Sequence, residues 1–203
     1  MRTLLQAIGE IVRADLKVTG PICLEEDDPG SRSGPVNLHK RGQAIVLKLD
    51  GLSPPLCRQQ GCQLRYAAND RIFPLFEHRK EGLTAVCDYI IFYQERQEGG
   101  SSEPPLFVFL CELKSGRPGS AKAQAENARL MVDYIMAMAR HHGRVQAAPR
   151  IELRGLVFSP RLPATKIKSN DRCAYEVLKE GMPDLKFAYC HAGAQYDLSY
   201  FCA

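Results

Sequence analysis

The stretch LFVFLCEL at residues 106–113, followed by Lys114, is apolar at every position except Glu112. A second stretch of similar character, LTAVCDYIIFYQ at residues 83–94, carries a single charge, Asp88. A strand that is apolar on nearly every residue is typical of the centre of a sheet that is covered on both faces. A polar connector rich in Glu, Gly and Ser separates the two stretches. We therefore predict that they form a hairpin at the centre of the fold.

Hydrophobic periodicity predicts further elements on both sides of this hairpin. In chain order they are an amphipathic helix within residues 1–18, a strand at 43–49, a long helix from Ser120 to Arg140, a strand at 151–159, a short helix at 171–180 and a strand at 185–190. Gln124, in the first turn of the long helix, lies on the stripe expected to face the sheet. This order predicts one α/β domain, residues 1–203, with a mixed central sheet flanked by helices.

The composition is that of a globular domain rather than of a disordered or fibrous chain. The 203 residues are 45% apolar, with 27 basic and 23 acidic side chains and a net charge of +4, which permits a nucleic-acid partner without requiring one. No run approaches the roughly 18 consecutive apolar residues of a membrane span, and charges interrupt the N-terminal segment. We therefore expect a cytoplasmic protein, in which the eight cysteines are buried residues, metal ligands or reactive thiols rather than disulfides.

Charged side chains interrupt both central strands. Glu112 and Lys114 are two residues apart on a strand and so share a face, and hairpin pairing could bring Asp88 beside Glu112. Two adjacent carboxylates repel unless a cation neutralises them, and their hard oxygen ligands suit Mg²⁺ or Mn²⁺ better than Zn²⁺. Lys114 would then lie close to the metal, and Gln124 could hydrogen-bond the attacking water or a phosphate oxygen.

This element order resembles the PD-(D/E)XK nuclease superfamily, whose restriction-endonuclease-like fold has an αβββαβ core. The resemblance covers about residues 2–159 and leaves 160–203 as a C-terminal extension. The matching motifs are Asp88, Glu112-Leu113-Lys114 and Gln124. Two departures are Cys87, where the superfamily name has Pro, and Ala128, where RecB-like members carry Tyr.

The resemblance implies a metal-dependent phosphodiesterase, acting on DNA by means of metal-activated water. Asp88, Glu112 and the backbone carbonyl of Leu113 would bind Mg²⁺, for which Mn²⁺ can substitute. Lys114 and Gln124 would complete the catalytic site. RNA stays open as an alternative substrate, the choice between endonuclease and exonuclease stays open, and restriction, repair and anti-phage defence are all compatible settings.

Basic residues in the loops that flank the expected strand ends could bind the phosphate backbone of DNA. They are Arg79, Lys80, Arg117, Lys122, Lys166 and Lys168, and an ordinary solvated basic surface is the alternative for each. One active site per chain cuts both strands of a duplex only in a homodimer or with a partner subunit.

Other hypotheses remain beside the nuclease. The chain could be a catalytically inactive nuclease-fold module that binds nucleic acid or assembles with a partner, although such members usually lose one of the three charged motif residues. Asp88 and Glu112 could also be solvated at strand ends, with Lys114 as a surface ion-pair partner. A zinc site at Cys57 and Cys62, with His39 or His78 as extra ligands, matches structural zinc spacings poorly. Other enzyme motifs, such as a Gly-rich phosphate loop or a Gly-x-Ser-x-Gly elbow, do not occur.

Overall fold

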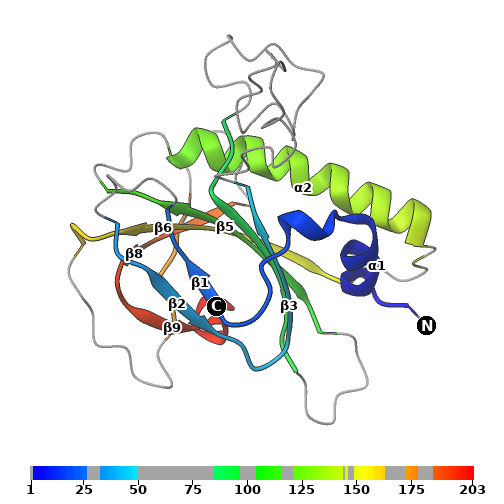
Figure 1. Cartoon of the computed structure of the whole chain (residues 1–203), viewed down its shortest axis with the longest axis horizontal. Coiled ribbons are helices and arrows are strands. Elements are labelled where there is room, and N and C mark those ends of the chain that lie inside the picture. Colours follow the sequence, from blue (N-terminus) through cyan, green and yellow to red (C-terminus); the bar gives the residue numbers. More distant parts are fainter. Residues whose placement is uncertain are drawn as a thin grey trace, which may run out of the picture.

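The computed structural model describes residues 2–26, 33–49, 85–96, 104–115, 121–143, 145, 149–162, 172–177 and 185–203. These residues form a mixed α/β fold with two β-sheets and two α-helices (Figure 1). None of the described helices is long and apolar enough to cross a membrane.

The larger sheet has six strands in the spatial order β3-β4-β5-β6-β8-β7. Their bounds are β3 Gln43–Lys48, β4 Tyr89–Gln94, β5 Leu106–Leu113, β6 Ile151–Ser159, β7 Glu176–Val177 and β8 Lys186–His191. β3, β4 and β5 are antiparallel, β5, β6 and β8 run parallel to one another, and β7 adds an antiparallel edge. The mixed sheet is therefore confirmed, with the β4–β5 pair in its interior.

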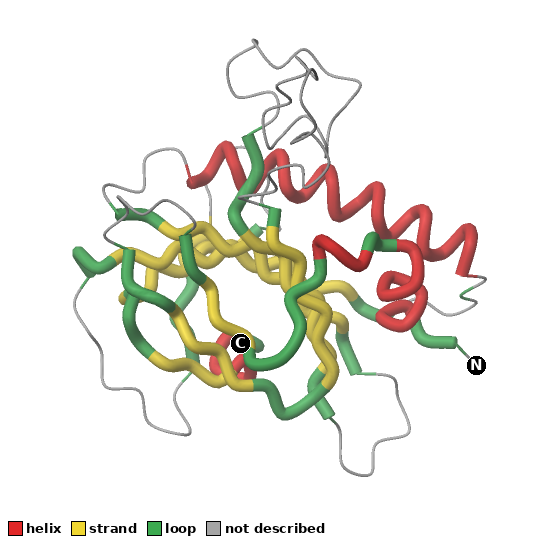
Figure 2. The backbone as a smooth tube through the Cα atoms, viewed as in Figure 1, coloured by secondary structure: helices red, strands yellow, loops and turns green. Residues whose placement is uncertain are grey.

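The two faces of this sheet are covered by different kinds of structure. Helices α1 (Leu4–Ile11) and α2 (Ala121–Gly143) pack on one face, against residues such as Ile90 and Leu110. A small sheet packs on the other face together with a short 3₁₀ helix, and it contains β1 Ile22–Leu24, β2 Val36–His39 and β9 Gln195–Asp197. Figure 2 shows the six-stranded sheet between these two layers. Every residue of β5 is buried as a result.

The small sheet was not predicted from the sequence, which indicated only a mixed central sheet flanked by helices. β1 and β2 pair antiparallel, and β2 pairs in parallel with β9, so Asn37 lies beside Gln195 near the end of the chain. Strands of three or four residues carry too short a pattern to be recognised by periodicity. The pairing partner of β2 is also remote in sequence, so this layer could not be inferred locally.

The C-terminal part of the chain differs from its prediction in one element and agrees with it in another. The helix expected at 171–180 is wrong, because Glu176 and Val177 form β7 and pair with β8. The strand predicted at 185–190 is confirmed as β8 of the central sheet, and β9 of the small sheet was not predicted. Hydrogen bonds to β8 stabilise the extended conformation of Glu176 and Val177, although the local sequence was predicted to be helical.

The contact between β6 and β8 depends on a missing side chain. Gly155 of β6 is paired with Phe187 of β8, and a Cβ atom at Gly155 would lie 2.5 Å from Phe187 Cε1. Phe187 is buried and cannot swing into solvent. The close approach of its ring to the strand therefore requires glycine at position 155.

We predict that Gly155→Ala lowers the free energy of unfolding by about 1–3 kcal/mol, because the added methyl group overpacks the core. Urea unfolding followed by circular dichroism measures the change. Gly9→Ala is the matched control, since its Cβ would meet only the end of the Ile45 side chain, at 3.2 Å, and alanine is favoured in a helix by about 1 kcal/mol. Equal losses in both variants would contradict the packing argument.

Candidate active site

Asp88 and Glu112 lie side by side at one end of the central sheet. The register of β4 and β5 pairs Tyr89 with Cys111, and one step further along, Asp88 is opposite Glu112. Residues directly opposite each other on antiparallel strands project from the same face. Leu110, two residues before Glu112, packs in the core beneath the helices. The hairpin therefore brings both carboxylate-bearing residues to the face that α2 covers.

Backbone hydrogen bonds hold Asp88 between two strands. The Leu113 N–H donates to Asp88 Oδ2 at 2.6 Å, at the end of β5. The Asp88 carbonyl accepts a hydrogen bond from the Leu49 N–H at 2.8 Å, at the end of β3. The hydrogen bond from the Leu113 N–H to the Asp88 carboxylate is charge-assisted and so stronger than one between neutral groups. It fixes the direction of the Asp88 carboxylate toward the carboxyl end of β5.

Glu112 is a buried carboxylate whose side chain is 3% exposed. Lys114 Nζ lies 2.5 Å from Glu112 Oε1. Burial raises the pKa of Glu112, and this outweighs the lowering by Lys114, Gln124 and the Asp88 backbone. The second carboxylate oxygen, Oε2, is buried and has no hydrogen-bond partner among the described residues. An unsatisfied buried carboxylate oxygen is costly, and a hard cation would satisfy it.

Gln124 connects Lys114 to the backbone that precedes Asp88. Lys114 Nζ donates to Gln124 Oε1 at 2.9 Å, and Gln124 Nε2 donates to the Val86 carbonyl at 3.4 Å. An ammonium group can only donate, so the amide oxygen must face Lys114. Helix α2 thus contributes a second acceptor, beside Glu112, that holds the lysine in place.

Asn127, which lies one turn after Gln124 on the same helix, was not predicted as a site residue from the sequence. Its Nδ2 donates to the Ala85 carbonyl at 2.8 Å. Residues three apart are neighbours on a helix surface, so the spacing of two amide side chains was a signal already present in the sequence.

The topology also brings Ser159 and His191 to this end of the sheet. They are paired in the register of β6 and β8, and the Lys114 N–H donates to the Phe158 carbonyl at 2.8 Å. His191 Nδ1 lies 2.6 Å from the Leu162 carbonyl. Because a carbonyl only accepts, Nδ1 carries a proton in this contact. No local sequence pattern links these residues to the carboxylates.

The other candidate residues are placed only in part. Lys122 is exposed in the first turn of α2, and His39 is exposed on β2 and contacts Gln195. Outside the described residues lie Arg79, Lys80, Arg117, Lys166, Lys168, Cys57, Cys62 and His78. Within the described ranges, no three His, Cys, Asp or Glu side chains gather closely enough to hold a metal. A cation beside Glu112 would therefore rely on two carboxylates together with backbone or water oxygens.

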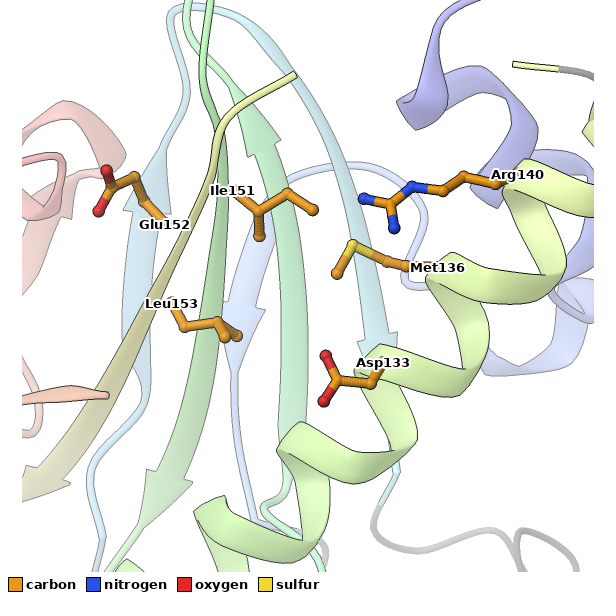
Figure 3. A pocket seen from close by; sticks show the side chains of 6 residues that line it. All are labelled: Asp133, Met136, Arg140, Ile151, Glu152 and Leu153. Atoms are coloured by element: carbon orange, nitrogen blue, oxygen red, sulfur yellow. The ribbon is translucent and has the colours of Figure 1, made fainter. Parts of the chain in front are cut away.

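A cleft of about 360 Å³ opens elsewhere, between α2 and the start of β6. It is lined by Asp133, Met136, Arg140, Ile151, Glu152 and Leu153 (Figure 3). Glu112 is paired with Val157, four residues beyond Leu153, so the carboxylates lie about 13 Å or more along the strands from the cleft. The cleft is thus separate from the candidate active site.

Comparison with protein-family models, with curated proteins and with solved structures gives no match for this chain.

We predict strong coupling between Glu112 and Lys114 in a double-mutant cycle with Glu112→Gln and Lys114→Met. Each single change should lower the free energy of unfolding by about 2 kcal/mol or more, because it leaves the other charge without its partner. The double variant should lose about 1–3 kcal/mol less than the sum. Urea unfolding in EDTA measures all four proteins.

The exposed pair of Arg2 and Glu10, with nitrogen and oxygen 3.1 Å apart, is the control for this cycle. Its coupling should stay below about 1 kcal/mol, because water screens both charges. A Glu112–Lys114 coupling no larger than that of the control would refute the buried ion pair.

Proposed function

We propose that the chain is a metal-dependent nuclease of the PD-(D/E)XK type that hydrolyses phosphodiester bonds in DNA. The observation that carries the proposal is the buried Glu112 carboxylate, with Oε2 unsatisfied among the described residues and with Asp88, one residue beyond the end of the β4–β5 pairing, bound to the Leu113 N–H. A buried carboxylate of this kind lowers the stability of the fold, and such costs are typical of functional sites. A cation bound between Asp88 and Glu112 accounts for it.

The arrangement of elements supports the restriction-endonuclease-like assignment. In chain order, α1, the antiparallel strands β3, β4 and β5, α2 and the parallel strand β6 follow the αβββαβ pattern. The small sheet and the strands after β6 are additions to that pattern. Glu112 lies at the end of β5, and Gln124 lies in the first turn of α2. These are the elements that carry the matching motifs in the αβββαβ pattern.

The donor set fits Mg²⁺, with Mn²⁺ as a substitute. Asp88, Glu112 and the Leu113 carbonyl offer only hard oxygen atoms, and Mg²⁺ commonly keeps several waters beside one or two carboxylates. When bound, the ion supplies Lewis-acid chemistry: it lowers the pKa of a water molecule and neutralises charge on a phosphate.

The chain itself supplies a fixed positive charge beside the reacting phosphate. Lys114 is held by Glu112 Oε1 at 2.5 Å and by Gln124 Oε1 at 2.9 Å. A preorganised ammonium in a partly buried site stabilises negative charge as it develops and needs no reorganisation to do so. Gln124 orients this lysine, and in this proposal Lys122, which is exposed in the same helical turn, would contact the DNA backbone.

We predict cleavage of plasmid DNA in Mg²⁺ or Mn²⁺ and none in EDTA. Asp88→Asn, Glu112→Gln and Lys114→Met should each reduce the rate at least about a hundredfold, because each removes a charge from the reacting centre. Asp133→Asn, in the separate cleft, is the matched control and should keep the wild-type rate. Gel assays with plasmid, single-stranded DNA and RNA measure cleavage and define the substrate.

Cleavage that survives EDTA or Asp88→Asn would refute this mechanism. DNA binding without cleavage of any substrate would instead favour a catalytically inactive binding module. Cleavage of both strands by a dimeric species alone would establish that two copies act together.

We also predict that Mn²⁺ raises the melting temperature of the wild-type protein but not that of Glu112→Gln. A ligand that binds only the folded state stabilises it in proportion to the logarithm of its concentration. Differential scanning fluorimetry across a Mn²⁺ series measures this shift without requiring activity. Equal shifts in both proteins would place the metal elsewhere.

A further inference from the structure

Helix α2 holds the short segment that leads into Asp88. Asn127 Nδ2 donates to the Ala85 carbonyl at 2.8 Å, and Gln124 Nε2 donates to the Val86 carbonyl at 3.4 Å. These are consecutive carbonyls, and Asp88 follows two residues after Val86. Two neighbouring helical side chains therefore bind two neighbouring backbone groups of this segment.

This segment precedes the paired part of β4, which begins at Tyr89. Val86 and Cys87 are nevertheless buried, and buried backbone groups require hydrogen-bond partners. On the side of α2 the amides provide them, and on the other side the Asp88 carbonyl accepts from the Leu49 N–H. The place at which Asp88 enters the site is thus set by α2 as well as by the sheet.

We infer that Asn127 is a positioning residue that sets Asp88 for metal binding. The inference rests on the proposed function. Asn127 contacts Ala85 and acts on Asp88 through the backbone. A displacement of about 1 Å in an active site can lower the reaction rate about a hundredfold. Residues that orient metal ligands contribute about 10–100-fold to metal affinity. Gln124 also holds Lys114, whereas Asn127 Nδ2 donates to the Ala85 carbonyl of this segment, so a change at Asn127 tests the position of the segment while the Lys114–Gln124 hydrogen bond stays in place.

The test compares Asn127→Ala and Asn127→Leu with the wild-type protein. The leucine variant keeps a side chain branched at Cγ and a helix propensity no lower than that of asparagine, but has no donor. Isothermal titration with Mn²⁺ alone should show about tenfold weaker binding in both variants. Hydrogen exchange of the Leu113 amide, which donates to Asp88 Oδ2 at 2.6 Å, should be faster by a similar factor.

Two controls separate positioning from general destabilisation. Tyr134→Ala, on the outer face of the same helix where Tyr134 is 66% exposed, should change neither readout. Glu112→Gln should abolish Mn²⁺ binding outright. A purely structural role for Asn127 would lower the melting temperature and leave the Mn²⁺ affinity of the folded protein unchanged.

Each outcome decides between distinct hypotheses. Wild-type binding of Mn²⁺ with unchanged affinity in both Asn127 variants would overturn the positioning role and leave the proposed nuclease standing. Absence of Mn²⁺ binding by the wild-type protein would overturn the metal site itself and this inference with it. Weaker Mn²⁺ binding together with faster exchange at Leu113 would support both.

Discussion

The ion pair between Glu112 and Lys114 is the constraint on which the end of the central sheet depends. β5 is buried along its whole length, so a carboxylate on it needs a cation and hydrogen-bond donors within reach. Lys114 supplies the cation, and α2 supplies Gln124 to hold the lysine. Apolar residues would fill this buried position at a lower cost in folding free energy than an ion pair, so the pair is not explained by stability alone.

The layers around the sheet explain how such a site stays in place. The small sheet and the two helices bury opposite faces of the same strands. A shift of β4 against β5 by one residue would therefore move core side chains to the wrong face of the sheet. The register in turn sets Asp88 opposite Glu112. The rigid hairpin and the amides of α2 thus act on the same pair of carboxylates from different sides.

Local sequence patterns were informative where the chain is uniformly apolar. The bounds predicted for 106–113 and 151–159 agree with β5 and β6, because long apolar runs exclude most other conformations. The segment that forms β7 was predicted as helix, since two exposed residues carry no strand pattern of their own. The small sheet was not predicted because its strands are short and because β2 pairs with β9, which lies more than 150 residues later in the sequence.

The sequence by itself determined the central strands, their mixed sheet and the placement of Glu112 and Lys114 on one face, because alternation along a strand is a local property. Only the tertiary structure decided that Gln124 turns its oxygen to Lys114, that Asn127 reaches Ala85, and that Ser159 and His191 share the same end of the sheet. These contacts join residues from separate elements. Their geometry follows from packing and strand order, which no short window of sequence contains.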